Sequence, residues 1–197
     1  MESKDSYSFV PSRDEAFELL KKYNKSDSLI RHALAVEGVM AHFAEKYGDD
    51  KVKWQVVGLV HDIDYELYPD EHCKKAKEIL ESHNWSQEYI RAVVSHGWGI
   101  CSDVEPQSML EKTLYAVDEL TGLIASTALM RPSVSVLDLT AKSVMKKWKD
   151  KRFAAGVDRS IIDRGAEMMG IERTELITET IMGMRTVAES IGLKGNL

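Results

Sequence analysis

The segment Trp54-Gln55-Val56-Val57-Gly58-Leu59-Val60-His61-Asp62 places an imidazole and a carboxylate directly after an apolar run. Burying either group costs free energy unless a partner compensates it, and one divalent cation can compensate both. The apolar run alone fits a buried strand as well as a helix, but the segments on both sides of it have helical periodicity. The sequence therefore predicts a metal site at the end of a buried helix.

The positions of turn-forming residues and prolines in the rest of the chain are typical of a helical protein. The chain contains no Asn-Gly or Asp-Gly dipeptide, which is the strongest short signal for a β-hairpin. Pro69, Pro106 and Pro132 lie just before or between long periodic segments, where proline is compatible with helices. These features predict an all-α fold.

Helix starts are marked by two capping boxes, in which a serine is followed three residues later by a glutamate. The serines are Ser12 and Ser108, and the glutamates are Glu15 and Glu111. Helical periodicity and end signals predict helices over residues 12–23, 27–47, 51–62, 70–82, 86–96, 108–125, 136–149, 158–169 and 174–190. In the helix over 27–47, His32 lies beside the apolar stripe and faces inward.

Length and composition indicate one globular unit. A chain of 197 residues with 44% hydrophobic residues can bury a substantial core. No repeat and no Gly- or Ser-rich linker divides it, so we expect a single domain over residues 1–197. The formal net charge of −6 disfavours a nucleic-acid polymer as partner, because phosphate backbones are bound mainly through excess Lys and Arg. A small substrate fits this charge better.

The cysteines and the N-terminal segment indicate the cellular compartment of the protein. Cys73 and Cys101 lie far apart in the sequence without a Cys-x-x-Cys motif, so we expect neither a disulfide framework nor a thiolate zinc site. The start of the chain, Met1–Asp5, lacks the basic and apolar regions of a signal peptide, and no apolar run is long enough to span a bilayer. We therefore expect a cytoplasmic protein with no membrane partner.

Four residues form a candidate metal site. Neighbouring residues on a helix point about 100° apart, so His61 and Asp62 reach one ion only near a helix end or between helices. His32 and Asp118 can complete the set from two other predicted helices. Imidazole and carboxylate ligands suit iron, manganese, zinc, cobalt or nickel better than calcium.

The order His32, then His61-Asp62, then Asp118 resembles the HD superfamily of metal-dependent phosphohydrolases over about residues 28–126. The segments Glu71-His72-Cys73-Lys74-Lys75-Ala76 and Val93-Val94-Ser95-His96-Gly97 resemble the two later histidine segments of its two-metal, six-ligand branch. The resemblance implies an HD-domain helical bundle at about 28–126. The N-terminal helix 12–23 and the C-terminal helices 136–190 would pack on this core as extensions.

The resemblance also implies how two divalent metal ions are held. The first ion would bind His32, His61, Asp62 and Asp118, and the second would bind His72 and His96, with Asp62 bridging both. Water between two such cations loses a proton near neutral pH, and the hydroxide can attack phosphorus while the ions offset the developing charge. This chemistry hydrolyses a phosphate ester or anhydride. The spacing of His96 and Asp118 looks most like small bacterial HD hydrolases of nucleotides, so the expected partner is a small phosphorylated substrate, a nucleotide.

One feature departs from that family. Many relatives carry a lysine soon after the His-Asp pair, whereas Ile63-Asp64-Tyr65-Glu66 follows here. Asp64 is a candidate general acid for the leaving oxygen or a residue that holds a metal-bound water, and it is also a candidate cap for the turn after the helix. The missing positive charge could come from the end of a basic helix, where Lys149, Lys151 and Arg152 are candidate substrate-binding residues; such a run also fits a solvated helix face.

Two other functions compete with hydrolysis. Some HD-like proteins use a di-iron pair to activate oxygen, and His72 and His96 are compatible with iron. A regulatory module could instead keep the metal cage and bind a nucleotide without turnover. The Met-rich tail fits either core packing or a homodimer face, and contains Met168, Met169, Met182 and Met184.

Overall fold

The computed structural model describes residues 8–196, so the N-terminal segment Met1–Asp5 lies outside the described residues. Nine α-helices form in this range: α1 Arg13–Tyr23, α2 Asp27–Tyr47, α3 Lys51–Val60, α4 Lys74–Ser82, α5 Gln87–Ser95, α6 Met109–Leu129, α7 Ala141–Trp148, α8 Arg159–Met169 and α9 Arg173–Thr186. A short 3-10 turn, η1, spans Pro69–Glu71. No β-strand forms between residues 8 and 196, and the all-α prediction is confirmed.

Both predicted capping boxes are present. The Ser12 side chain accepts a hydrogen bond from the backbone N–H of Glu15, and the Glu15 carboxylate accepts one from the N–H of Ser12. Ser108 and Glu111 repeat the arrangement at the start of α6. Each pair satisfies two backbone N–H groups that the first turn of a helix leaves without partners.

The apolar segment before His61 is a helix rather than a strand. Asp50 caps α3 by accepting hydrogen bonds from the N–H groups of Val52 and Lys53. The helix then buries Trp54 and its following valines completely. It ends at Val60, two residues before the predicted end, although His61 keeps helical backbone angles.

Other helix boundaries also differ from the prediction, and the last helix, α9, ends at Thr186 rather than at residue 190. The helix expected over 70–82 is divided, because Cys73 adopts a left-handed conformation (φ 65°) between η1 and α4. The helix expected from residue 136 begins at Ala141, because Val136 donates its N–H to Leu193 O at 2.9 Å and is held against the C-terminal segment. Helix α6 continues to Leu129, four residues beyond the predicted end at 125, since residues 125–129 contain no Gly or Pro.

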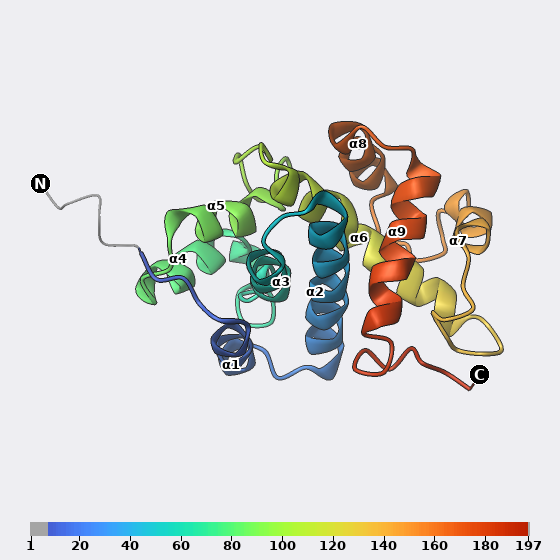
Figure 1. The fold of residues 1–197 in the computed structure, drawn as a ribbon, viewed down its shortest axis with the longest axis horizontal. Coiled ribbons are helices and arrows are strands. Elements are labelled where there is room, and N and C mark those ends of the chain that lie inside the picture. Colours follow the sequence, from blue (N-terminus) through green and yellow to red (C-terminus); the bar gives the residue numbers. More distant parts are fainter. Residues whose placement is uncertain (1–7, 197) are drawn as a thin grey trace, which may run out of the picture.

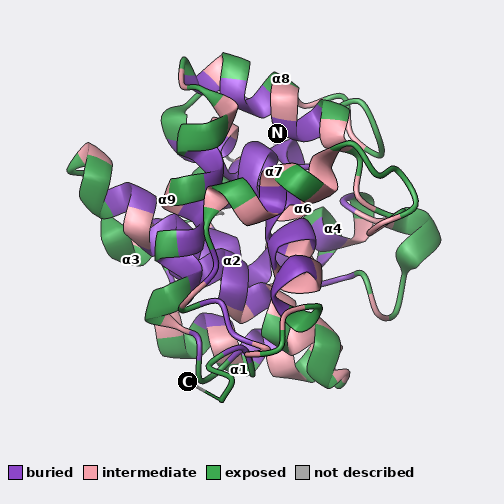
Figure 2. Ribbon diagram, turned by 90° about the vertical axis from the view of Figure 1, so that its right-hand side faces the viewer, coloured by how far each residue is buried: buried purple, intermediate pink, exposed green. Residues whose placement is uncertain are grey.

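Helix α2 lies in the middle of the molecule, with α3 on one side and α9 on the other (Figure 1). It also contacts α6, which packs against α5, α7 and α8. Buried positions gather where α2, α6 and α9 face one another (Figure 2). One hydrophobic cluster extends from α1 to the segment after α9, so the helices on both flanks of residues 28–126 contribute to the same core.

A glycine permits the close contact between α9 and α2. A Cβ atom at Gly183 would lie 2.6 Å from the Cα of Val39, closer than real Cβ contacts allow. The missing side chain therefore lets the two helix backbones approach directly. Separately, no helix within residues 8–196 has the length and apolar content needed to cross a membrane.

Candidate metal centre

Three helices bring the first group of predicted ligands together. His32 comes from α2, His61 and Asp62 follow α3, and Asp118 lies on α6. The Nε2 atom of His32 is 2.9 Å from Asp118 Oδ1 and 3.1 Å from His61 Nε2. His61 Nε2 is in turn 3.3 Å from Asp118 Oδ1. One ligand atom from each of the four residues falls within 4.8 Å of all the others, so this group could hold a metal ion.

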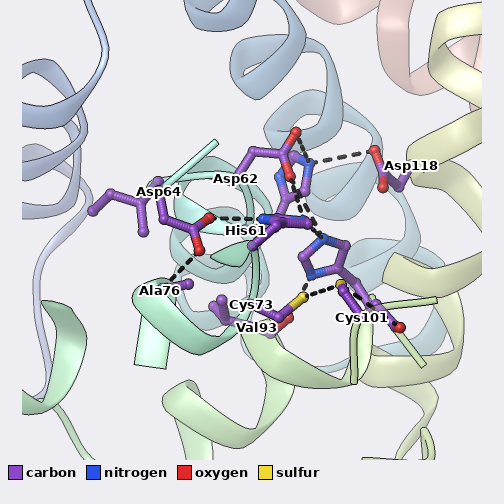
Figure 3. A network of polar contacts seen from close by, with 12 residues as sticks. His61, Asp62, Asp64, Cys73, Ala76, Val93, Cys101 and Asp118 are labelled. Carbon is purple, nitrogen blue, oxygen red and sulfur yellow. Dashed lines mark hydrogen bonds and ion pairs between the residues drawn. The ribbon is translucent and has the colours of Figure 1, made fainter. Parts of the chain in front are cut away.

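A second group lies beside the first and shares Asp62 with it (Figure 3). The Oδ1 atom of Asp62 is 3.3 Å from His72 Nε2 and 3.5 Å from His96 Nε2. Its other oxygen, Oδ2, is 3.6 Å from His32 Nε2 and 3.5 Å from His61 Nε2. The two oxygens of one carboxylate thus face two different sets of histidines.

The histidines are oriented by hydrogen bonds from their outer ring nitrogens. His61 Nδ1 lies 2.8 Å from Gly58 O, and His96 Nδ1 lies 2.5 Å from Val93 O. A carbonyl oxygen only accepts, so each Nδ1 carries a proton and donates it. In the neutral ring this leaves an unprotonated Nε2 directed into the site, which is the arrangement of a metal-ligating histidine.

The orientation of the histidine rings indicates whether a cation fits between them. His72 Nδ1 donates to Asp64 Oδ1 at 2.8 Å, so in the neutral rings the facing Nε2 atoms of His72 and His96, 3.1 Å apart, both present lone pairs. Two lone pairs at this distance repel unless positive charge lies near both. The donor set of nitrogen and carboxylate oxygen matches divalent transition metals, so the residues present fit such ions.

The electrostatics of the first group also favour positive charge. Burial opposes ionisation of Asp62 and Asp118, but the charge of His61 and hydrogen bonds from the histidines outweigh it and hold the pKa of both carboxyls well below the usual value. Burial likewise opposes charging of His61, yet the charges of Asp62 and Asp118 raise its pKa well above the ordinary value. A proton on His61 thus compensates the carboxylates, and a metal ion can replace it.

Comparison with known proteins agrees with this geometry. The HD domain family matches residues 29–123. This segment is an HD domain. The match contains all six predicted ligands: His32, His61, Asp62, His72, His96 and Asp118. No solved structure matches the chain.

Five of the six predicted ligands, all except His61, border a cavity of about 350 Å³. Tyr65 and Tyr115 form part of its wall, and Val157 and Ile161 from the C-terminal part of the chain close another side. Glu119, next to Asp118, also lines it; burial and the charge of Asp118 raise the pKa of Glu119 to about 7. Glu119 is not among the residues predicted from sequence, because an acidic residue on an amphipathic helix has no local feature that distinguishes it from a solvated one.

Asp64 lies behind His72 of the second group rather than in the cavity. It is fully buried, and its two oxygens accept hydrogen bonds from His72 Nδ1 and from the backbone N–H of Ala76, both at 2.8 Å. The carboxylate thus orients a histidine and satisfies an N–H in the first turn of α4. This arrangement favours a positioning role for Asp64 over the direct catalytic role considered from the sequence.

The structure does not bring the predicted cationic residues to the cavity. Lys149, Lys151 and Arg152 are exposed in the segment after α7 and do not line it, so their role in binding substrate stays a prediction. Arg164 on α8 is nearer, because its Nη1 donates a hydrogen bond to the hydroxyl of Tyr115 at 3.3 Å. Its position depends on the packing of α8 against α6, which periodicity alone does not define.

The two cysteines, far apart in the sequence, lie side by side at the edge of the HD domain's second group. Both are free thiols, and their Sγ atoms are 2.9 Å apart. Cys101 also lines the cavity. Their spacing in the sequence does not indicate this contact, because it arises from the turn at Cys73 and from the loop after α5.

Proposed function

We propose that this protein is a metal-dependent phosphohydrolase that cleaves a phosphate ester or anhydride of a small molecule, a nucleotide. The observation that carries the proposal is the position of Asp62 between two sets of histidines. A carboxylate that faces two sets of nitrogen ligands is suited to bridge two cations, and paired cations are suited to phosphoryl chemistry.

Each ion would have its own ligands. His32, His61 and Asp118 with one oxygen of Asp62 would hold the first ion, and His72 and His96 with the other oxygen would hold the second. When bound, two divalent ions supply positive charge for the phosphate oxygens and acidify a water molecule near neutral pH. Iron, manganese, zinc, cobalt and nickel all suit these ligands.

The chain's own residues would position the phosphate and exclude water. Burial of His61 and Asp64 keeps the ligands in fixed orientations, which lowers the cost of organising the site. The guanidinium of Arg164, hydrogen-bonded to Tyr115 in the cavity wall, would add a positive charge that attracts an anionic substrate. Arg164 would thereby provide some of the charge that the absent lysine supplies in many relatives.

A second cavity provides room for the organic part of the substrate. It has a volume of about 490 Å³ and shares His32 and Gly122 with the metal cavity. Ala125, Leu129 and Met184 give it an apolar wall, which suits a nucleobase better than an ion. A phosphate at the metal ligands could thus remain attached to a group seated between α2, α6 and α9.

The proposal is tested by metal analysis and a phosphoester screen. We expect about two equivalents of metal in the purified protein and metal-dependent phosphate release from nucleotides, also without oxygen and with a redox-inert ion. Asp62→Asn should abolish release, whereas Asp103→Asn, which changes an exposed residue, should not. Oxygen consumption in place of phosphate release would identify an oxygenase instead. Metal and nucleotide binding without any product would identify a regulatory module.

A further inference from the structure

The contact between Cys73 and Cys101 joins two segments that carry ligands of the second group. Cys73 directly follows His72, is 1% exposed, and adopts φ 65° at the start of α4. Cys101 is exposed in the loop after α5. Their Sγ atoms, 2.9 Å apart, are close enough to form a bond after a small movement (Figure 3).

The backbone at Gly97, directly after His96, makes room for both sulfur atoms. A Cβ atom at Gly97 would overlap the Sγ atoms of Cys73 and Cys101, so a larger residue would separate the thiols. The loop is tight as well, because Gly97 O accepts hydrogen bonds from the N–H groups of Cys101 and Ser102 at 3.0 and 3.1 Å. The residue after His72 is therefore one of the two thiols, and the residue after His96, Gly97, lies against both of them.

We propose that Cys73 and Cys101 form a redox-active dithiol, which a low-molecular-weight disulfide converts to an intramolecular disulfide that weakens binding of the second metal ion. The exposed thiol of Cys101 reacts first: its sulfur bonds to one sulfur of the small disulfide, whose S–S bond breaks and releases one small thiol. The Cys73 sulfur then displaces the second small thiol from Cys101. The protein loses two hydrogen atoms and two electrons, and the small disulfide gains them.

Oxidation changes the distance between the two segments. A disulfide bond is about 2.05 Å long, so the sulfur atoms at 2.9 Å must approach by roughly 0.9 Å. The movement is transmitted to His72 and to Gly97 beside His96, whereas His32, His61 and Asp118 lie on other segments. Disturbing groups that orient metal ligands typically lowers affinity 10- to 100-fold, so we expect about a tenfold loss for the second ion and less than about a twofold change for the first.

Disulfide formation is tested on the metal-free protein with oxidised glutathione as the probe. Mass spectrometry should show a monomer that has lost two hydrogen atoms, and peptide mapping should link residue 73 to residue 101. Cys73→Ser should stop at a glutathione adduct on Cys101, and Cys101→Ser should leave Cys73 unreacted because that thiol is buried. A final product with glutathione on Cys101 in the wild type, or a disulfide between two chains, would overturn the proposal.

The effect on metal is tested separately by titrating Mn²⁺ into the reduced and oxidised forms. This step rests on the proposed two-ion site, whereas disulfide formation does not. We expect two binding events in the reduced form and a selective loss of affinity for one of them after oxidation, with no effect of the oxidant on Cys101→Ser. Unchanged affinities for Mn²⁺ in a protein that carries the disulfide would refute the proposed effect of oxidation on metal binding. A single binding event already present in the reduced form would refute the two-ion site, while the mass and mapping data would still report on the thiol pair.

Discussion

The Nδ1 atom of His72 lies 2.8 Å from Oδ1 of Asp64, a carboxylate with no exposed surface. The other oxygen of Asp64 accepts the N–H of Ala76 at the same distance. One buried side chain therefore orients a predicted metal ligand, His72, and supports the first turn of α4. A substitution of Asp64 should affect metal binding and folding together.

The first prediction concerns Asp64→Asn. The two hydrogen bonds reach different oxygens of Asp64, and in asparagine one of these positions is an NH2 group that donates, so one buried N–H group loses its acceptor. We expect a 10- to 100-fold loss of affinity for the second ion, because a partner that orients a ligand is lost. The free energy of unfolding should fall by about 1–3 kcal/mol. Metal titration and chemical denaturation measure the two effects.

The matched control is Asp70→Asn, which changes an exposed aspartate in η1. It should leave metal stoichiometry and stability unchanged within experimental error. Retention of both ions with wild-type affinity by Asp64→Asn would show that His72 needs no buried acceptor.

The second prediction concerns metal removal. A metal ion would bind only the folded arrangement of His32, His61, Asp62 and Asp118, because it brings together residues as far as 86 positions apart in the sequence. At a free ion concentration 100 times Kd, one site stabilises the folded state by about 2.7 kcal/mol. Thermal denaturation should therefore show a lower Tm after chelation and recovery when Mn²⁺ is restored. A Tm that is independent of the ion would contradict a site that exists only in the folded protein.

Of the six residues that gather at the candidate metal site, the His61-Asp62 pair could be identified from the sequence for a physical reason, whereas His72 and His96 were identified by the resemblance to the HD superfamily. Polar groups such as His61 stand out next to an apolar run, because burial without a partner is unfavourable. Capping boxes at Ser12 and Ser108 located helix starts equally well, since both partners of a box lie within four residues. These signals are local, and each segment of chain carries its own.

Features formed by contacts between distant segments could not be found in this way. The turn at Cys73 interrupts a segment with good helical periodicity, and it is supported by Asp64, nine residues earlier. The Cys73–Cys101 contact and the position of Arg164 near Tyr115 depend on how whole helices pack. No periodicity within a single helix encodes such contacts. The sequence therefore predicts substrate-binding cations in the basic run after α7 and does not indicate Arg164.

The third prediction concerns the contact of α9 with α2. Gly183→Ala places a Cβ atom 2.6 Å from the Cα of Val39, and a backbone atom cannot move away as a flexible side chain can. Overpacking of this kind costs about 1–3 kcal/mol, so the free energy of unfolding should fall by that amount. Gly156→Ala is the control, because no atom lies within 4 Å of its Cβ position. Equal stability of the two variants, measured by urea denaturation, would mean that α9 does not pack this closely.

The fourth prediction concerns pH and the ion pairs between α2 and α9. Burial raises the pKa of Glu179, but hydrogen bonds from Lys46 at 2.7 Å and His42 at 2.6 Å lower it further than burial raises it. A carboxyl whose folded pKa lies below its unfolded value stabilises the folded state above the unfolded pKa, near 4.5, and loses this contribution as the pH falls through the folded pKa. We expect Glu179→Gln to lower stability at pH 7 by roughly 0.5–1 kcal/mol, a modest value because the pair is partly solvated. The difference from wild type should shrink below about pH 4.

Glu175→Gln is the matched control. Glu175 also accepts a hydrogen bond from Lys46, but its side chain is 45% exposed against 18% for Glu179, so the effect of its substitution on stability should be smaller at every pH. Urea denaturation across the pH range measures both variants, and a Glu179→Gln effect that grows as the pH falls would contradict a lowered pKa for Glu179 in the folded state.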